Sequence, residues 1–119
     1  MNLEQQLKIF FDTLCSHIGE NPTREGLVHT PKRLTQSLAD MLNGYDKSPK
    51  DALGEVFEDG VCDEMIVLKK LSFYSMCEHH LLPFFGYANV AYVPKDKKVI
   101  GLSKIPRLLD FVTKKPGMQ

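Results

Sequence analysis

Two stretches in the second half of the chain, Met65-Ile66-Val67-Leu68 and Leu71-Ser72-Phe73-Tyr74-Ser75, decide the fold class because β-branched and aromatic residues dominate them. Residues 86–93 (GYANVAYV) and 99–100 (VI) have the same character. The polar stretch 93–99 contains a proline, which predicts a hairpin connection between these last two segments. We therefore expect an antiparallel sheet between residues 65 and 100.

Helical patterns flank this region on both sides. Apolar residues recur at three- and four-residue spacing over 3–18, and residues 31–43 follow a Thr-Pro start and stop before a glycine. A further helix is expected to open at Ser103 and to end near residues 115–117. Residues 46–60 are expected to be mostly irregular, with a short helix near 51–53. The prediction is an α+β chain, with a helical N-terminal arm (1–60) and a sheet-and-helix unit (61–119).

Composition excludes several classes of function. The 119 residues suit one domain or part of one, and 15 basic residues balance 15 acidic ones, so no global field favours nucleic acid. The apolar stretches are too short to span a membrane, and the N-terminus lacks the features of a signal peptide. Three irregularly spaced cysteines fit a reducing compartment, so a cytoplasmic location is expected. Of these, Cys15 is interpreted as a core residue and Cys62 as incidental.

The densest cluster of possible metal ligands is Cys77-Glu78-His79-His80, directly after a predicted strand. A thiolate and an imidazole three residues apart can reach one zinc ion, which leaves His79 free to carry protons. Catalytic zinc needs three protein ligands, however, and only Cys77 and His80 are evident. The alternative is two surface histidines beside a buried cysteine.

Basic residues gather where two helices are expected to start. Ser103, Lys104 and Arg107 open the last helix, where free backbone N–H groups and the helix dipole attract anions, so a phosphate site is plausible there. The alternative is an ordinary solvated surface. The same alternative applies to Lys32 and Arg33 after Thr30.

Four collinear motifs closely resemble the GTP cyclohydrolase I family: 21–27 (NPTREGL), 30–33 (TPKR), 73–86 (FYSMCEHHLLPFFG) and 101–104 (GLSK). The resemblance implies that Cys77 and His80 bind Zn²⁺, that a metal-bound water attacks C8 of GTP, and that His79 moves protons while the ring opens and formate leaves. It implies 7,8-dihydroneopterin triphosphate as the product, for tetrahydrofolate or other pterin synthesis.

The same resemblance assigns the triphosphate to four residues. Ser103, Lys104 and Arg107 would hold it at a helix start, and Arg33 would reach it from a neighbouring subunit. Pro106, between Lys104 and Arg107, is an unusual residue for this motif.

The family resemblance also implies a tunnelling fold (T-fold), in which antiparallel strands pair with helices on one face. Subunits would form pentameric rings that stack into a homodecamer, with active sites between subunits. Similar proteins continue beyond the equivalent of Gln119 and carry there the third zinc ligand and a second catalytic histidine. We therefore expect a chain truncated at its C-terminus, holding the first half of the T-fold and only part of a site.

Two other functions remain as alternatives. A truncated, catalytically incomplete member of the family would act as an interaction or regulatory module and form hetero-oligomers with full-length chains. Another tunnelling-fold pterin or deazapurine enzyme is disfavoured because its motifs do not surround Cys77.

Overall fold

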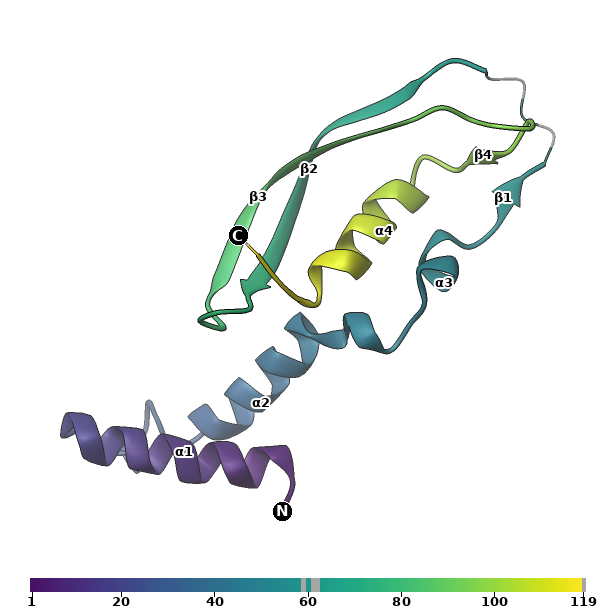
Figure 1. Ribbon diagram of the computed structural model, residues 1–119. Helices are drawn as coiled ribbons and strands as arrows, with labels where there is room; N and C mark the ends of the chain where they lie inside the picture. The colour runs from purple at the N-terminus through teal and green to yellow at the C-terminus, as the bar shows by residue number, and fades with distance from the viewer. Residues whose placement is uncertain (59, 61–62, 119) are drawn as a thin grey trace. The chain divides into compact units, whose positions relative to one another are not determined.

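The computed structural model describes all residues of the chain except 59, 61, 62 and 119 (Figure 1). Its residues form two compact units, Met1–Asp40 and Met41–Gln119. The predicted division of the chain into a helical arm (1–60) and a sheet-and-helix unit (61–119) stays a prediction. No helix in the described part of the chain has the length and apolar content needed to cross a bilayer.

The first unit is helical, as the periodicity predicts. Helix α1 spans Leu3–Ile18 and begins with a capping box between Asn2 and Gln5; Gly19 ends it in the left-handed conformation. Its apolar stripe buries Phe11 and Cys15, so the interpretation of Cys15 as a core residue is confirmed. Helix α2 spans Thr30–Met41.

The loop between these helices is organised by local polar contacts. The side-chain oxygen of Asn21 accepts hydrogen bonds from the backbone N–H and the hydroxyl of Thr23. Arg24 donates to Glu20 at 3.0 Å, and this contact lowers the pKa of the Glu20 carboxyl. The 21–27 motif therefore forms an ordered turn.

A long antiparallel ribbon dominates the second unit. Strand β2, Ile66–Cys77, pairs with β3, Pro83–Tyr92, along almost its whole length. Exposed and half-buried residues alternate along β3, as expected of a sheet with one covered face. Figure 1 shows helix α4, Lys104–Thr113, lying along one side of this ribbon, and α4 buries Ile105 and Phe111.

A β-bulge interrupts the ribbon halfway. The register shifts between Leu68 and Leu71, so Lys69 and Lys70 together face Asn89. Lys70 takes a positive φ of 55°, and its backbone N–H donates to the side-chain oxygen of Asn89 at 2.9 Å. The extra residue keeps Leu68 and Leu71 on the same, half-buried face of the ribbon.

Shorter elements complete the second unit. The 3-10 helix η1 (Asn43–Tyr45) and helix α3 (Pro49–Leu53) lie against α4. Strand β5 (Pro116–Gly117) pairs in parallel with the end of β2, giving a sheet of order β3-β2-β5. The sheet is therefore mixed and not purely antiparallel.

The predicted hairpin connection over residues 93–99 is present as a tight turn, in which Lys95 and Lys98 form an antiparallel bridge, but the strands on either side of it do not pair with each other. Strand β4 (Val99–Ile100) pairs with β1 (Val56–Phe57) and not with β3. Asp96 and Lys97 have positive φ and form a tight turn, and the hydroxyl of Tyr92 bonds to both backbone groups of Ile100, at 3.0 and 3.2 Å. The Tyr92 side chain thus joins the end of β3 to β4, although the two strands belong to different sheets.

Gly44 provides a test of how tightly η1 packs on α4. A Cβ at this position lies 2.6 Å from the carbonyl oxygen of Phe111 and 2.8 Å from that of Lys114. We expect Gly44→Ala to lower the free energy of unfolding by about 1–3 kcal/mol, because the backbone cannot yield as a flexible side chain does. Urea denaturation measures this change.

The matched control is Gly101→Ala, since a Cβ there meets its nearest neighbour, Lys104 Cγ, at an ordinary 3.6 Å. It should change the unfolding free energy by about 0.5 kcal/mol or less. Equal urea midpoints for the two variants would contradict the packing described for Gly44.

Candidate metal centre

The four-residue cluster predicted as a metal site lies at the end of the ribbon. Cys77 is the last residue of β2 and is buried, whereas Glu78, His79 and His80 are exposed in the turn to β3. The Cys77 N–H donates to the carbonyl of Leu82 at 2.8 Å, and the Leu81 N–H donates to the carbonyl of Cys77 at 2.7 Å. These two bonds close the turn around the backbone of Cys77.

The turn carries backbone strain beside the cluster. Leu81 has a φ of 56°, a conformation that a branched side chain rarely adopts and that costs about 1–3 kcal/mol. The closing bonds to Cys77 and the start of β3 at Pro83 hold it there. Left-handed geometry at Leu81 reverses the chain directly after His80.

The structure brings Cys77 and His80 together. The Cys77 Sγ and the His80 Nδ1 are 3.4 Å apart. Tetrahedral zinc, with a Zn–S bond of about 2.3 Å and a Zn–N bond of about 2.0 Å, places two such donors about 3.5 Å apart. The pair therefore fits two ligand positions of one zinc ion. The metal would replace the proton that the Cys77 thiol and the His80 ring nitrogen share in a hydrogen bond.

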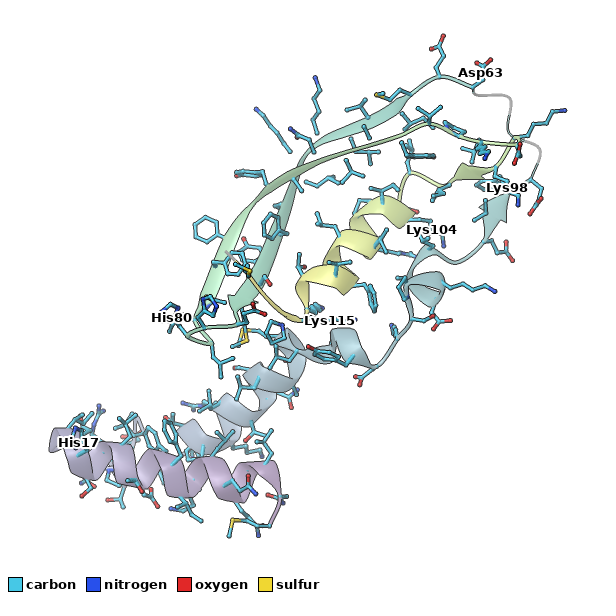
Figure 2. The ribbon with its side chains drawn as sticks, in the orientation of Figure 1. His17, Asp63, His80, Lys98, Lys104 and Lys115 are labelled. Atoms are coloured by element: carbon cyan, nitrogen blue, oxygen red, sulfur yellow. The ribbon has the colours of Figure 1, made fainter. Side chains whose placement is uncertain are left out.

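His79 lies outside this pair. Its ring stands edge-on to the ring of His80, with the centroids 6.2 Å apart, and it is exposed. Figure 2 shows His80 at the end of the ribbon. The imidazole of His79 is thus close to the candidate metal position and open to solvent.

Two donors do not complete a zinc site. Within residues 1–58, 60 and 63–118, no three His, Cys, Asp or Glu side chains are grouped to hold a metal ion. Catalytic zinc sites in proteins use three protein ligands and leave one position for water. The described residues therefore offer at most two of the three ligands that such a site needs.

The segment after α4 contacts this centre directly, which the sequence did not predict. The Glu78 N–H donates to the carbonyl of Gly117 at 2.9 Å, and the Ser75 hydroxyl donates to the carbonyl of Lys115 at 3.3 Å. Ser75, Met76 and Cys77 are all buried, so the alternation along β2 stops where β5 covers its edge. The sequence signal for this contact is weak, because Ser75 is one of two serines in a strand that also holds two lysines.

The predicted phosphate residues lie at the other end of α4. Ser103 precedes the helix without a side-chain capping bond, and Lys104 is its first residue (Figure 2). The Lys104 ammonium lies against Gly54, where a Cβ would come within 2.9 Å of Nζ. Arg107 lines a pocket of about 380 Å³ formed by η1, α3 and α4.

The metal pair and these cations are separated by the length of the helix. Strand β5, which follows α4, meets β2 at Cys77, whereas Lys104 begins α4. The 10 residues of α4 span about 15 Å. The described residues of one chain therefore form two separate groups and not one continuous site.

Of the remaining predicted residues, the structure describes Arg33 but not Cys62. Arg33 is an exposed residue of α2 in the first unit, and its N–H donates to the carbonyl of His29 at 3.1 Å. Cys62, interpreted from the sequence as incidental, lies outside the described residues.

Comparison with known proteins gives a consistent result along the chain. A family model described as GTP cyclohydrolase I matches residues 7–119. A GTP cyclohydrolase 1 of Helicobacter hepaticus is 62% identical over 117 residues, covering 98% of this chain and 56% of that protein. A GTP cyclohydrolase 1 of Wolinella succinogenes is 47% identical over 117 residues, covering 98% of this chain and 60% of that protein. The chain thus spans less than two thirds of the length of these relatives.

The Cys77–His80 pair is testable by metal binding alone. We expect His80→Ala to weaken the binding of Zn²⁺ at least tenfold, because it removes one of two adjacent donors. Competition against a chromophoric chelator measures the Kd. The control is His17→Ala, which removes an exposed histidine from α1. Equal zinc affinities for the two variants would rule out His80 as a ligand.

Proposed function

The chain belongs to the GTP cyclohydrolase I family, and on this premise we propose that it takes part in hydrolytic opening of the purine ring of GTP. The products of that reaction are formate and 7,8-dihydroneopterin triphosphate, a precursor for tetrahydrofolate and other pterins. The observation that carries the proposal is the 3.4 Å approach of Cys77 Sγ and His80 Nδ1 beside an exposed His79.

Each residue of the cluster has a separate role in this proposal. Cys77 as a thiolate and His80 as a neutral imidazole hold Zn²⁺, together with a third ligand outside the described pair. A Zn²⁺ ion held there would supply the Lewis acidity that makes a water molecule nucleophilic enough to attack C8 of the guanine ring. His79, close to the pair but not part of it, accepts and returns protons while the ring opens and formate departs.

The triphosphate is assigned to the opposite end of α4. Ser103, Lys104 and Arg107 occupy the first turn of this helix or precede it, where backbone N–H groups and positive side chains favour phosphate. A length of about 15 Å between this end and the metal pair favours sites built from more than one copy of the chain. Each copy would give its metal pair to one site and its cations to another.

This arrangement supports an oligomer in which the sites lie between subunits. Arg33 on α2 would extend to the triphosphate held by a neighbouring copy. Pentameric rings stacked as a decamer, the assembly expected from the resemblance, belong to the same proposal, as do the T-fold assignment and the cytoplasmic location.

A second candidate function rests on a specific observation. The described residues provide two zinc donors, and Tyr74, Phe85 and Tyr87 on the ribbon are 73–77% exposed. A chain that pairs with longer copies through such a surface and does not itself turn over GTP would act as an interaction or regulatory module. Co-purification with a full-length relative tests this candidate.

GTP turnover by the unmodified protein separates the two functions, and a His79 variant tests the proposed proton carrier. We expect His79→Ala to lower turnover by about 100-fold or more, because a positioned proton carrier is lost, and to leave zinc affinity unchanged. Turnover is followed by formate release and by the fluorescence of the oxidised pterin. His17→Ala again serves as the control.

The outcomes are distinct. Unchanged turnover in His79→Ala would remove His79 from the catalytic role. Zinc binding and assembly with full-length chains, with no turnover in the unmodified protein, would instead support the regulatory module.

A further inference from the structure

Ser75 is a buried polar residue on a face of β2 that is otherwise apolar. Its side chain shares that face with Leu71 and Phe73, because residues alternate along a strand, and only 9% of its surface is exposed. A buried hydroxyl costs free energy unless it is hydrogen-bonded. The partner here is the carbonyl of Lys115, 40 positions later in the chain.

That bond holds the segment which contacts the metal pair. Residues 115–117 run alongside 75–78, with Met76 opposite Pro116 and Cys77 opposite Gly117. Pro116 has no N–H to donate, and the pairing is only two residues long. A side-chain bond at the start of such a short strand therefore contributes a large share of its attachment to β2.

Two backbone hydrogen bonds connect residues 115–117 to Cys77 and to the turn that follows it. The carbonyl of Gly117 accepts from the Glu78 N–H and so fixes the plane of the Cys77–Glu78 peptide. The carbonyl in this peptide belongs to Cys77 and accepts from the Leu81 N–H, which closes the turn that carries His80. The orientation of Cys77 and the position of His80 thus depend on residues 115–117.

Residues 114 and 115, which connect α4 to β5, are held by contacts with η1 and α4. The Lys115 ammonium lies 4.7 Å from the centre of the Phe111 ring and 5.1 Å from that of Tyr45. The Gly44 N–H donates to the carbonyl of Lys114 at 3.0 Å. With these contacts on the α4 side, the Ser75 hydroxyl and the short β2–β5 pairing together hold α4's C-terminal extension against β2.

We propose that Ser75 is a positioning residue for the metal pair: its hydroxyl, through Lys115 and Gly117, orients the Cys77–Glu78 peptide and keeps Cys77 Sγ and His80 Nδ1 at the separation that suits zinc. This role rests on the proposed metal site at Cys77 and His80. Ser75 contacts neither donor, so it acts on the metal through the backbone, as supporting hydrogen bonds around metal ligands do.

The test compares two nearly isosteric replacements that differ in the hydroxyl. Ser75→Thr keeps the donor and Ser75→Val replaces it with a methyl group, so steric effects are matched. We expect Ser75→Val to raise the Kd for Zn²⁺ about tenfold relative to Ser75→Thr. Ser75→Ala should behave like Ser75→Val, and Ser72→Ala, which removes an exposed serine from the same strand, should match the unmodified protein.

Cobalt spectra provide a readout that a purely structural role would not change. With Co²⁺ in place of Zn²⁺, the thiolate-to-cobalt absorption band reports the geometry at Cys77. We expect this band to shift or weaken in Ser75→Val and to be retained in Ser75→Thr. Urea denaturation, run in parallel, confirms that the variants compared are folded.

The outcomes distinguish this inference from the function on which it rests. The unmodified protein should show a cobalt band that is lost in Cys77→Ser. If it does not, the proposed metal site is wrong, and the proposed role of Ser75 is overturned together with it. If that band is present but Ser75→Val and Ser75→Thr have the same Kd and spectrum, only the positioning role is overturned. A loss of stability in Ser75→Val with unchanged metal binding overturns it as well.

Discussion

The pairing of β5 with the end of β2 is the contact on which the second unit depends. Without it, Ser75, Met76 and Cys77 would lie at the edge of a two-stranded ribbon, and such ribbons are marginally stable in water. Strand β5 makes β2 the central strand at this point and buries these residues. Because β5 directly follows α4, the same contact fixes the C-terminal end of that helix against the sheet.

Local periodicity was enough to predict the helices and the ribbon. The bounds of α1 agree with the predicted 3–18, and α2 and α4 lie within about two residues of their predictions. Each of these elements repeats an apolar pattern over about three turns or more, so the signal does not depend on distant contacts. The two strands of the ribbon likewise follow from β-branched and aromatic residues.

Long-range pairing was not predictable in the same way. Pro116 and Gly117 disfavour strands by propensity, yet they form β5 because β2 lies beside them. Residues 93–99 form the predicted hairpin turn, but the partner of β4 is β1, about 40 positions earlier, and not β3. Two-residue strands have no periodicity of their own, so only the folded chain reveals what they pair with.

In the candidate site, too, the local features were predictable from the sequence and the long-range contacts were not. The spacing of Cys77 and His80 in sequence predicts that one ion can reach both, and the 3.4 Å between their donor atoms agrees. The left-handed Leu81 and the carbonyls of Lys115 and Gly117 contribute through the backbone, where residue type carries little information. Ser103, Lys104 and Arg107 share a helix start in sequence, but nothing local indicates how far that start lies from the metal pair.

The bulge at Lys69 and Lys70 separates the ribbon into two segments with independent side-chain alternation. In a regular strand, adding or removing one residue turns every later side chain to the opposite face. Here the bulge already absorbs one extra residue, and Asn89 stabilises it with a side-chain bond. The side-chain alternation of residues 66–68 is therefore independent of that of residues 71–77, so the face on which Cys77 lies is set by the segment after the bulge.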